Sequence, residues 1–176
     1  MALTESNAGE ASAFLRLVQP EIAGAYRLAG YLLGDAGEAE DATQDALEKA
    51  WQAWPRLRQT DSVGAWFDRI VANVCHDRLR RRGRVRELEL DDAVAAVPLA
   101  RDPFRESLAR DELSRLVRKL PPDQQVVVAL RYWRDLSLEQ TAERLGVPLG
   151  TVKSRLYYAI RTLRRELGAQ SRETRR

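Results

Sequence analysis

The chain has 176 residues, of which 44% are hydrophobic and 31% are charged, which is enough for one medium domain or two small ones. It contains no uninterrupted apolar run near the roughly 20 residues of a membrane span, and no secretory signal pattern. A single cysteine, Cys75, excludes an internal disulfide. The composition therefore predicts a cytoplasmic protein without a membrane span. The net charge is +3, and the basic residues are concentrated in two separate clusters.

The first predicted helix follows a short polar start. Residues 1–11 are small and polar, and we expect them to be disordered. Apolar residues then recur at helical spacing from Phe14 to Leu33. Pro20 interrupts this pattern and is expected to kink or split the helix.

A second helix is predicted from Asp35, which fits a capping box with Glu38, to the stop at Pro55. One side of it is apolar and contains Trp51 and Trp54. The other side is acidic, and its residues leave two interpretations open, a solvated face or a hard-metal site. Solvation is favoured over metal binding. This side includes Asp41, Gln44, Asp45 and Glu48.

A third helix is predicted over residues 63–82, after a polar loop at residues 56–62. Its end carries an arginine run, which either contacts a polyanion or forms a solvated surface. His76 is the only histidine, so a zinc site is not expected. A stripe distinct from the buried side comprises Trp66, Arg69, Asn73, His76 and Arg80.

The chain is expected to form an all-helical (all-α) fold of two small domains. We place the first domain at residues 12–84, a flexible acidic linker at residues 85–105, and the second domain at residues 106–168. Within the second domain, a helix opened by Pro121 and Pro122 is predicted to be closed by Trp133.

A helix-turn-helix is the strongest motif of the chain. Ser137 and Gln140 form a capping box, Gly146 lies at the sharp turn, and Pro148 can open the next helix. Apolar residues at Ala142, Val152, Leu156, Ala159 and Leu163 are predicted to face inward.

The outer face of the second helix of this motif is polar and rich in hydrogen-bond donors, as a major-groove recognition helix requires. The alternative is a helical hairpin with an exposed basic face. The residues predicted to lie on or beside the outer face are Lys153, Ser154, Arg155, Tyr157, Tyr158 and Arg161.

Together these segments resemble a known family. The segments DAGEAEDATQDALEKAWQAW, AWFDRIVANVCHDRLRRRGR, LPPDQQVVVALRY and GTVKSRLYYAIRTLRREL, in this order, are similar to bacterial RNA polymerase sigma factors of the extracytoplasmic-function (ECF, sigma-70 family) type. The resemblance covers roughly residues 12–167. It implies that the first domain binds core polymerase and melts promoter DNA, and that the second reads the upstream promoter element.

The resemblance also implies residue roles. The acidic helix face (Asp41, Gln44, Asp45, Glu48) would dock on the clamp helices of the largest polymerase subunit. The loop carrying Arg56 and Arg58 would capture an unstacked base, and the stripe from Trp66 to Arg80 would lie at the edge of the melted DNA. The second domain would lie on the flap of the second-largest subunit and contact the upstream element through Lys153, Ser154, Arg155, Tyr157 and Arg161.

The recognition helix departs from the family pattern, because Tyr157, Tyr158 and Ile160 occupy positions where basic residues are common. The preferred promoter sequence is therefore open. An anti-sigma protein is a common partner in this family, and no residue of the chain demonstrates one.

No catalytic constellation, phosphate-binding glycine loop or nucleophile elbow is present, so we expect no enzyme activity, no cofactor and no metal. The alternative function is a helix-turn-helix regulator that binds a duplex operator without polymerase.

Overall fold

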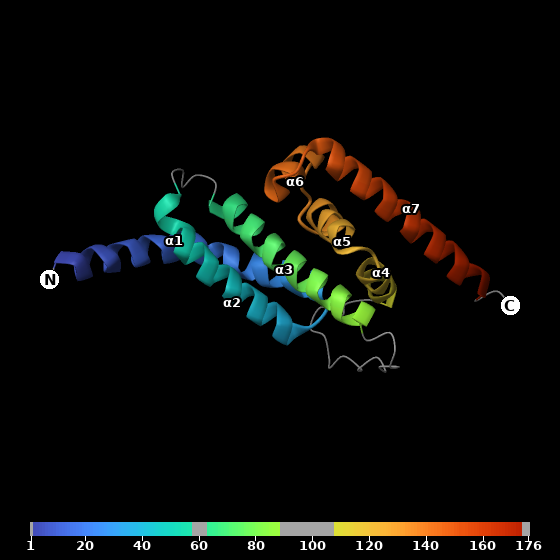
Figure 1. The fold of residues 1–176 in the computed structure, drawn as a ribbon, viewed down its shortest axis with the longest axis horizontal. Helices are drawn as coiled ribbons and strands as arrows, with labels where there is room; N and C mark the ends of the chain where they lie inside the picture. Colours follow the sequence, from blue (N-terminus) through green and yellow to red (C-terminus); the bar gives the residue numbers. More distant parts are fainter. Residues whose placement is uncertain (1, 58–62, 89–107, 174–176) are drawn as a thin grey trace.

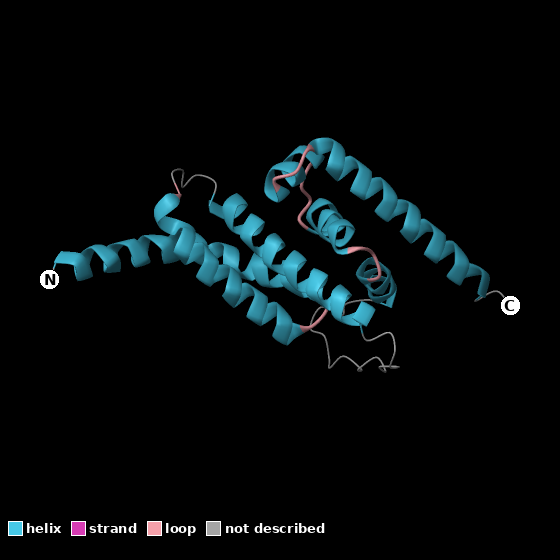
Figure 2. Cartoon of the chain, in the orientation of Figure 1, coloured by secondary structure: helices cyan, strands magenta, loops and turns pink. Residues whose placement is uncertain are grey.

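The computed structural model describes residues 2–57, 63–88 and 108–173. In these ranges every regular element is helical and no strand occurs, which confirms the all-helical prediction (Figures 1 and 2). Most of the predicted linker lies outside them. We call residues 2–88 the N-terminal half and residues 108–173 the C-terminal half.

The N-terminal half consists of three long helices and a short turn. These are α1 (Ala2–Leu33), α2 (Ala36–Ala53), the 3-10 turn η1 (Trp54–Arg56) and α3 (Val63–Leu88). Asp35 caps α2 as predicted, because its side chain accepts a hydrogen bond from the backbone N–H of Glu38 at 2.8 Å. The carboxylate of Glu38 pairs with Arg82 on α3, so this cap is not a full capping box.

The structure corrects two expectations about the first helix. Residues 2–11 continue α1 instead of being disordered, because this stretch contains several alanines, which favour a helix. Pro20 lies inside α1, so the helix is not split there. Its own side chain is exposed, while the neighbouring Val18 is 1% exposed, so packing of the flanking turns holds the helix across the missing hydrogen bond.

The core of the N-terminal half lies between α1, α2 and α3. Phe67 and Leu28 are fully buried in it. The side of α2 that faces this core consists of small residues, which let the helices approach closely: Ala39, Ala42, Ala46 and Ala50, all 0% exposed. The rings of Trp51 and Trp54 both pack edge-on against Phe14.

Cys75 lies in this core, and its burial raises the pKa of the thiol from 9.0 to about 12, against smaller opposing contributions from Arg78 and Arg82. An unfolded chain can ionise the thiol above pH 9, whereas the folded chain keeps it neutral until about pH 12. The free energy of unfolding should therefore fall by about 1.4 kcal/mol for each pH unit in this window. Urea unfolding of the wild type and of Cys75→Ala between pH 8 and pH 10 tests this, and equal pH slopes in the two proteins would contradict it.

The C-terminal half consists of α4 (Leu108–Arg118), α5 (Pro122–Val128), the π-helical turn η2 (Ala129–Trp133), α6 (Leu138–Leu145) and α7 (Leu149–Glu173). Pro122 opens α5 as predicted. The half lies against α3, and α7 runs along its outer side (Figure 1).

The two halves share apolar packing. Val126, Ala129 and Leu130 belong to the same buried cluster as Phe67 of α3. A smaller cluster within the C-terminal half joins Val127, Ala142 and Val152. The two halves are therefore packed against each other, and α3 forms part of the contact surface.

Candidate nucleic-acid interface

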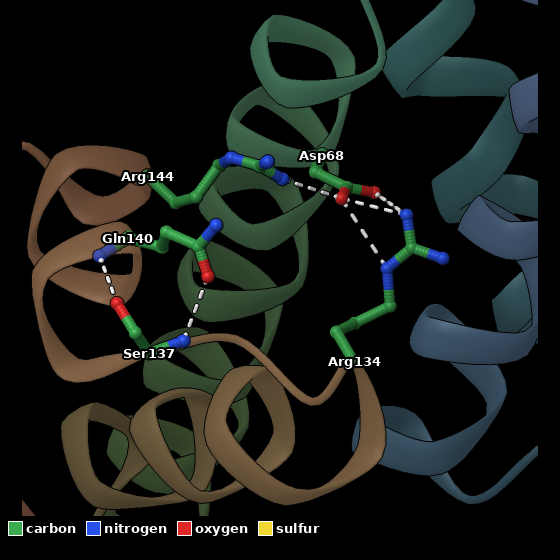
Figure 3. A network of polar contacts seen from close by, with 5 residues as sticks. All are labelled: Asp68, Arg134, Ser137, Gln140 and Arg144. Carbon is green, nitrogen blue, oxygen red and sulfur yellow. Dashed lines mark hydrogen bonds and ion pairs between the residues drawn. The ribbon is translucent and has the colours of Figure 1, made fainter.

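The helix-turn-helix has the local geometry that the sequence predicts. The Ser137 hydroxyl oxygen accepts a hydrogen bond from the Gln140 N–H at 3.0 Å, and Gln140 Oε1 accepts one from the Ser137 N–H at 2.8 Å (Figure 3). Gly146 ends α6 with φ of +64°, a conformation that glycine adopts without strain. The capping box and the turn glycine are both confirmed.

Packing between α6 and α7 follows the predicted pattern. Val152 and Ala159 are 0% exposed and Ala142 is buried, while Leu156 and Leu163 pack against these residues at partial burial. The backbone N–H of Thr151 donates to the carbonyl of Pro148 at 2.9 Å, so Pro148 lies directly before the first turn of α7.

The opposite face of α7 is exposed and carries five of the six residues predicted there, namely Lys153, Ser154, Tyr157, Tyr158 and Arg161. Arg155 differs from them. Its guanidinium lies 3.2 Å from Asp123 of α5 and its side chain is half-buried. The exposed face has the donors and the rings that a groove-reading helix needs, and Arg155 lies at its margin.

The residues of the predicted stripe on α3 differ in their exposure and contacts. Arg69, Asn73 and Arg80 are exposed. Trp66 is partly buried against the N-terminal core, with its ring 6.3 Å from that of Trp54. Two members reach the other half of the molecule, because the guanidinium of Arg69 lies against Gly146 of α6 and His76 contacts Asp123 of α5.

Asp123 connects the two predicted DNA-binding faces. Its Oδ1 atom lies 2.8 Å from His76 Nε2 on α3 and 3.2 Å from the Arg155 guanidinium on α7. A single carboxylate of the C-terminal half thus engages one residue from each predicted face. The sequence analysis did not identify Asp123.

Asp68 is the second carboxylate between the halves, and it is 2% exposed. Arg134 approaches it from one side and Arg144 from the other, with closest N–O distances of 2.6 and 2.8 Å (Figure 3). Arg134 donates hydrogen bonds to both carboxylate oxygens, so the pair is bidentate. Sequence reasoning missed this cluster. The sequence does contain a signal that Asp68 is buried. Asp68 directly follows the apolar Phe67, and apolar residues resume two positions after Asp68, so it lies within the apolar stretch of the helix.

The π-helical turn η2 directs residues toward the N-terminal half. The Arg134 N–H donates to the Ala129 carbonyl, and Trp133 stacks on Tyr31 of α1 with 4.8 Å between ring centroids. Trp133 is the last residue of η2, so it ends this helical stretch as predicted. Its side chain is 38% exposed, and its ring forms a contact between the halves.

The acidic face of α2 is largely exposed, although Glu48 accepts a hydrogen bond from Gln52 at 3.2 Å. Asp41, Gln44 and Glu48 are exposed. Asp45 accepts a hydrogen bond from Arg78 of α3 at 2.6 Å, and this bond, the largest contribution, raises the pKa of the Arg78 guanidinium. A groove of about 550 Å³ runs beside this pair between α2 and α3. Of the two loop arginines, Arg56 is exposed at the end of η1, and Arg58 lies outside the described residues.

Comparisons with known proteins agree with this architecture. Residues 16–85 match the model of sigma-70 region 2, and residues 110–163 match that of sigma-70 region 4. The chain is 34% identical over 175 residues to the ECF RNA polymerase sigma factor SigL of Mycobacterium tuberculosis, which covers 96% of this chain and 98% of SigL. The chain belongs to the ECF sigma factors of the sigma-70 family.

Two further proteins resemble this sigma factor. The ECF RNA polymerase sigma factor SigE of Mycolicibacterium smegmatis is 36% identical over 154 residues, and the match spans 85% of this chain and 59% of SigE. The sigma factor RpoE of Bartonella quintana, solved in complex with the anti-sigma factor NepR, has a similar fold with a TM-score of 0.68. It is 24% identical, and the match covers 89% of this chain and 97% of that one.

Within residues 2–57, 63–88 and 108–173 of this sigma factor, no group of three or more potential metal ligands occurs. In the same ranges no helix is long and apolar enough to cross a lipid bilayer. The interactions that organise the predicted faces in the described residues are therefore ion pairs, hydrogen bonds and ring contacts.

Proposed function

We propose that this sigma factor binds core RNA polymerase in the cytoplasm, directs it to specific promoters and helps to melt them, with no catalysis of its own. The observation that carries the proposal is that predicted DNA-binding residues are exposed on two separate helices. One is α3, in the part that matches region 2, and the other is α7, in the part that matches region 4. A duplex-binding regulator needs only the residues on α7.

The face on α7 is proposed to read the upstream promoter element as duplex DNA. An α-helix fits the major groove, where side chains reach the base edges, while flanking cations hold the phosphates. Arg161 lies near the centre of this face, and Lys153 lies at its edge. Arg155 can join the DNA contacts once it leaves Asp123.

The face on α3 is proposed to hold DNA where the strands separate. Arg69, Asn73 and Arg80 are exposed and can contact phosphates and unpaired bases. Extrusion of a base costs a few kcal/mol of stacking, and a protein pocket with stacking contacts offsets it. The segment that contains Arg58 is proposed to supply that pocket, as the family resemblance implies.

The acidic face of α2 is proposed to dock on the clamp helices of the largest polymerase subunit, and the C-terminal half on the flap of the second-largest. The exposed Asp41, Gln44 and Glu48 are available for a basic partner, whereas Asp45 would first exchange Arg78 for it. Regulation by an anti-sigma protein is a further proposal, which rests on membership of the family.

A pair of substitutions tests the proposal, each serving as the control for the other. Asp41→Arg should weaken binding to core polymerase about tenfold, because it places a cation on the proposed docking face. Arg161→Ala should weaken binding of the holoenzyme to the upstream element about tenfold, because a central base contact is lost. Both side chains are exposed, so neither change should alter folding.

The measurements are pull-down of sigma-free core polymerase and gel-shift of promoter duplexes, with and without core. Asp41→Arg should retain upstream-element binding when enough core is present, and Arg161→Ala should retain core binding. If the chain forms no complex with core and binds its duplex tightly alone, it is the regulator and not the promoter-specificity subunit.

A further inference from the structure

Two exposed tyrosines lie side by side on the outer face of α7. Tyr157 is 62% exposed and Tyr158 is 53% exposed, although both rings are large and mostly apolar. Their ring centroids are 5.4 Å apart with planes at 75°, so the edge of one ring meets the face of the other. The pair forms one continuous apolar surface that nothing in the described residues covers.

This surface lies across the middle of the proposed DNA-reading face. A turn of about 100° per residue places Ser154 and Arg161 opposite the buried Val152, with the two tyrosines on either side of that line. Neighbouring side chains on a helix normally diverge. The contact between the two rings shows that they lean toward each other over the space between Ser154 and Arg161.

Two positions near the pair show what else this face presents. A Cβ atom at Gly150, on the same face, would meet no heavy atom within 4 Å. The hydroxyl of Ser154 donates to the Thr151 carbonyl at 3.0 Å, so its hydrogen is already used within the helix. The centre of the face therefore presents apolar rings, with Arg161 as its strong donor.

Apolar rings in a major groove have one matching group among the natural bases. The C5-methyl group of thymine is the apolar feature that a base pair presents there, and side chains recognise it by contact. Phosphate contacts would instead fall to the cations at the edge of the face, such as Lys153.

We propose that Tyr157 and Tyr158 together form an apolar platform that recognises thymine methyl groups in the upstream promoter element. The centroid separation of 5.4 Å exceeds the rise of about 3.4 Å between successive bases, so the pair covers two neighbouring base pairs. This inference rests on the proposed function of α7 as the element-reading helix.

Removal of single methyl groups tests the platform. Promoter duplexes are first selected from a random library with the wild-type holoenzyme, and each thymine of the selected upstream element is then replaced by deoxyuridine. Deoxyuridine pairs like thymine and lacks only the methyl group. At one or two neighbouring positions the replacement should weaken binding about fourfold, the effect of losing one buried methyl contact.

Matched variants assign this effect to the rings. In the double variant Tyr157→Ala/Tyr158→Ala the deoxyuridine effect should disappear, whereas Tyr157→Phe/Tyr158→Phe should keep it. Lys153→Ala should weaken thymine and deoxyuridine duplexes equally. Circular dichroism melting of each variant verifies that α7 still folds, which the exposure of both tyrosines favours.

Several results would overturn the inference: a selected element without thymine, no deoxyuridine effect at any position, or an equal effect in the alanine double variant. A phenylalanine double variant as weak as the alanine one would instead assign hydroxyl contacts. These failures differ from failure of the proposed function, in which the holoenzyme would select no element at all.

Discussion

Asp68→Asn should weaken the attachment between the two halves of this sigma factor by about 3 kcal/mol. The reason is that removal of the negative partner of a buried ion pair leaves the positive charges buried without a counter-charge. Asp68 is 2% exposed, and its carboxylate meets the guanidinium groups of Arg134 and Arg144. Asparagine has nearly the same shape, so the helix itself should remain. The two arginines would face each other across a neutral amide, and the halves should separate more often.

Small-angle scattering measures this result as a larger radius of gyration, and fluorescence reports whether Trp133 leaves Tyr31. Glu143→Gln is the matched control, since it removes one negative charge from an exposed position next to Arg144. The double variant Arg134→Gln/Arg144→Gln changes charge in the opposite direction and should open the molecule similarly. Scattering curves that coincide for wild type and Asp68→Asn would contradict the prediction.

Phe67→Ala, one residue earlier on the same helix, should destabilise the N-terminal half by about 3–5 kcal/mol. Phe67 is 0% exposed and is the largest of the fully buried side chains described, so alanine would leave a cavity that rigid helices fill poorly. The free energy of unfolding is measured by urea titration followed by circular dichroism.

Phe67→Leu is the control for this variant, because it keeps most of the volume and should lose about 1 kcal/mol. A Phe67→Ala protein as stable as Phe67→Leu would show that the core closes around the missing ring. Comparison with Asp68→Asn separates two roles of α3. Phe67 stabilises the core of the N-terminal half, whereas Asp68 binds the C-terminal half.

The features that the sequence predicts well are determined by neighbouring residues. The capping box of Ser137 and Gln140 and the turn at Gly146 each span a few positions, so their geometry follows from local chemistry. The outer face of α7 follows from helical periodicity in the same way. The prediction of disorder for residues 2–11 is wrong because their composition is polar and yet favours a helix.

The features that sequence reasoning missed depend on distant partners. Asp68 and Arg144 are 76 positions apart, and His76 and Asp123 are 47 apart, so no local pattern pairs them. The stacking of Trp133 on Tyr31 was not predicted either, for another reason. A π-helical turn adds a residue per turn, which rotates the residues at its end away from the face that regular spacing predicts.

The contacts between the halves have a geometric consequence. Asp68 and His76 lie on one helix, about 12 Å apart along its axis, and Tyr31 lies on another. These contacts act beside the apolar packing of Leu130 in the cluster of Phe67, against which Leu145 of α6 also packs. Loss of Asp68 would remove the ion pairs of Arg134 and Arg144 while the contacts of His76 and Tyr31 and the apolar packing remain. The movement that this loss permits would therefore begin between α3 and α6, where Arg144 meets Asp68.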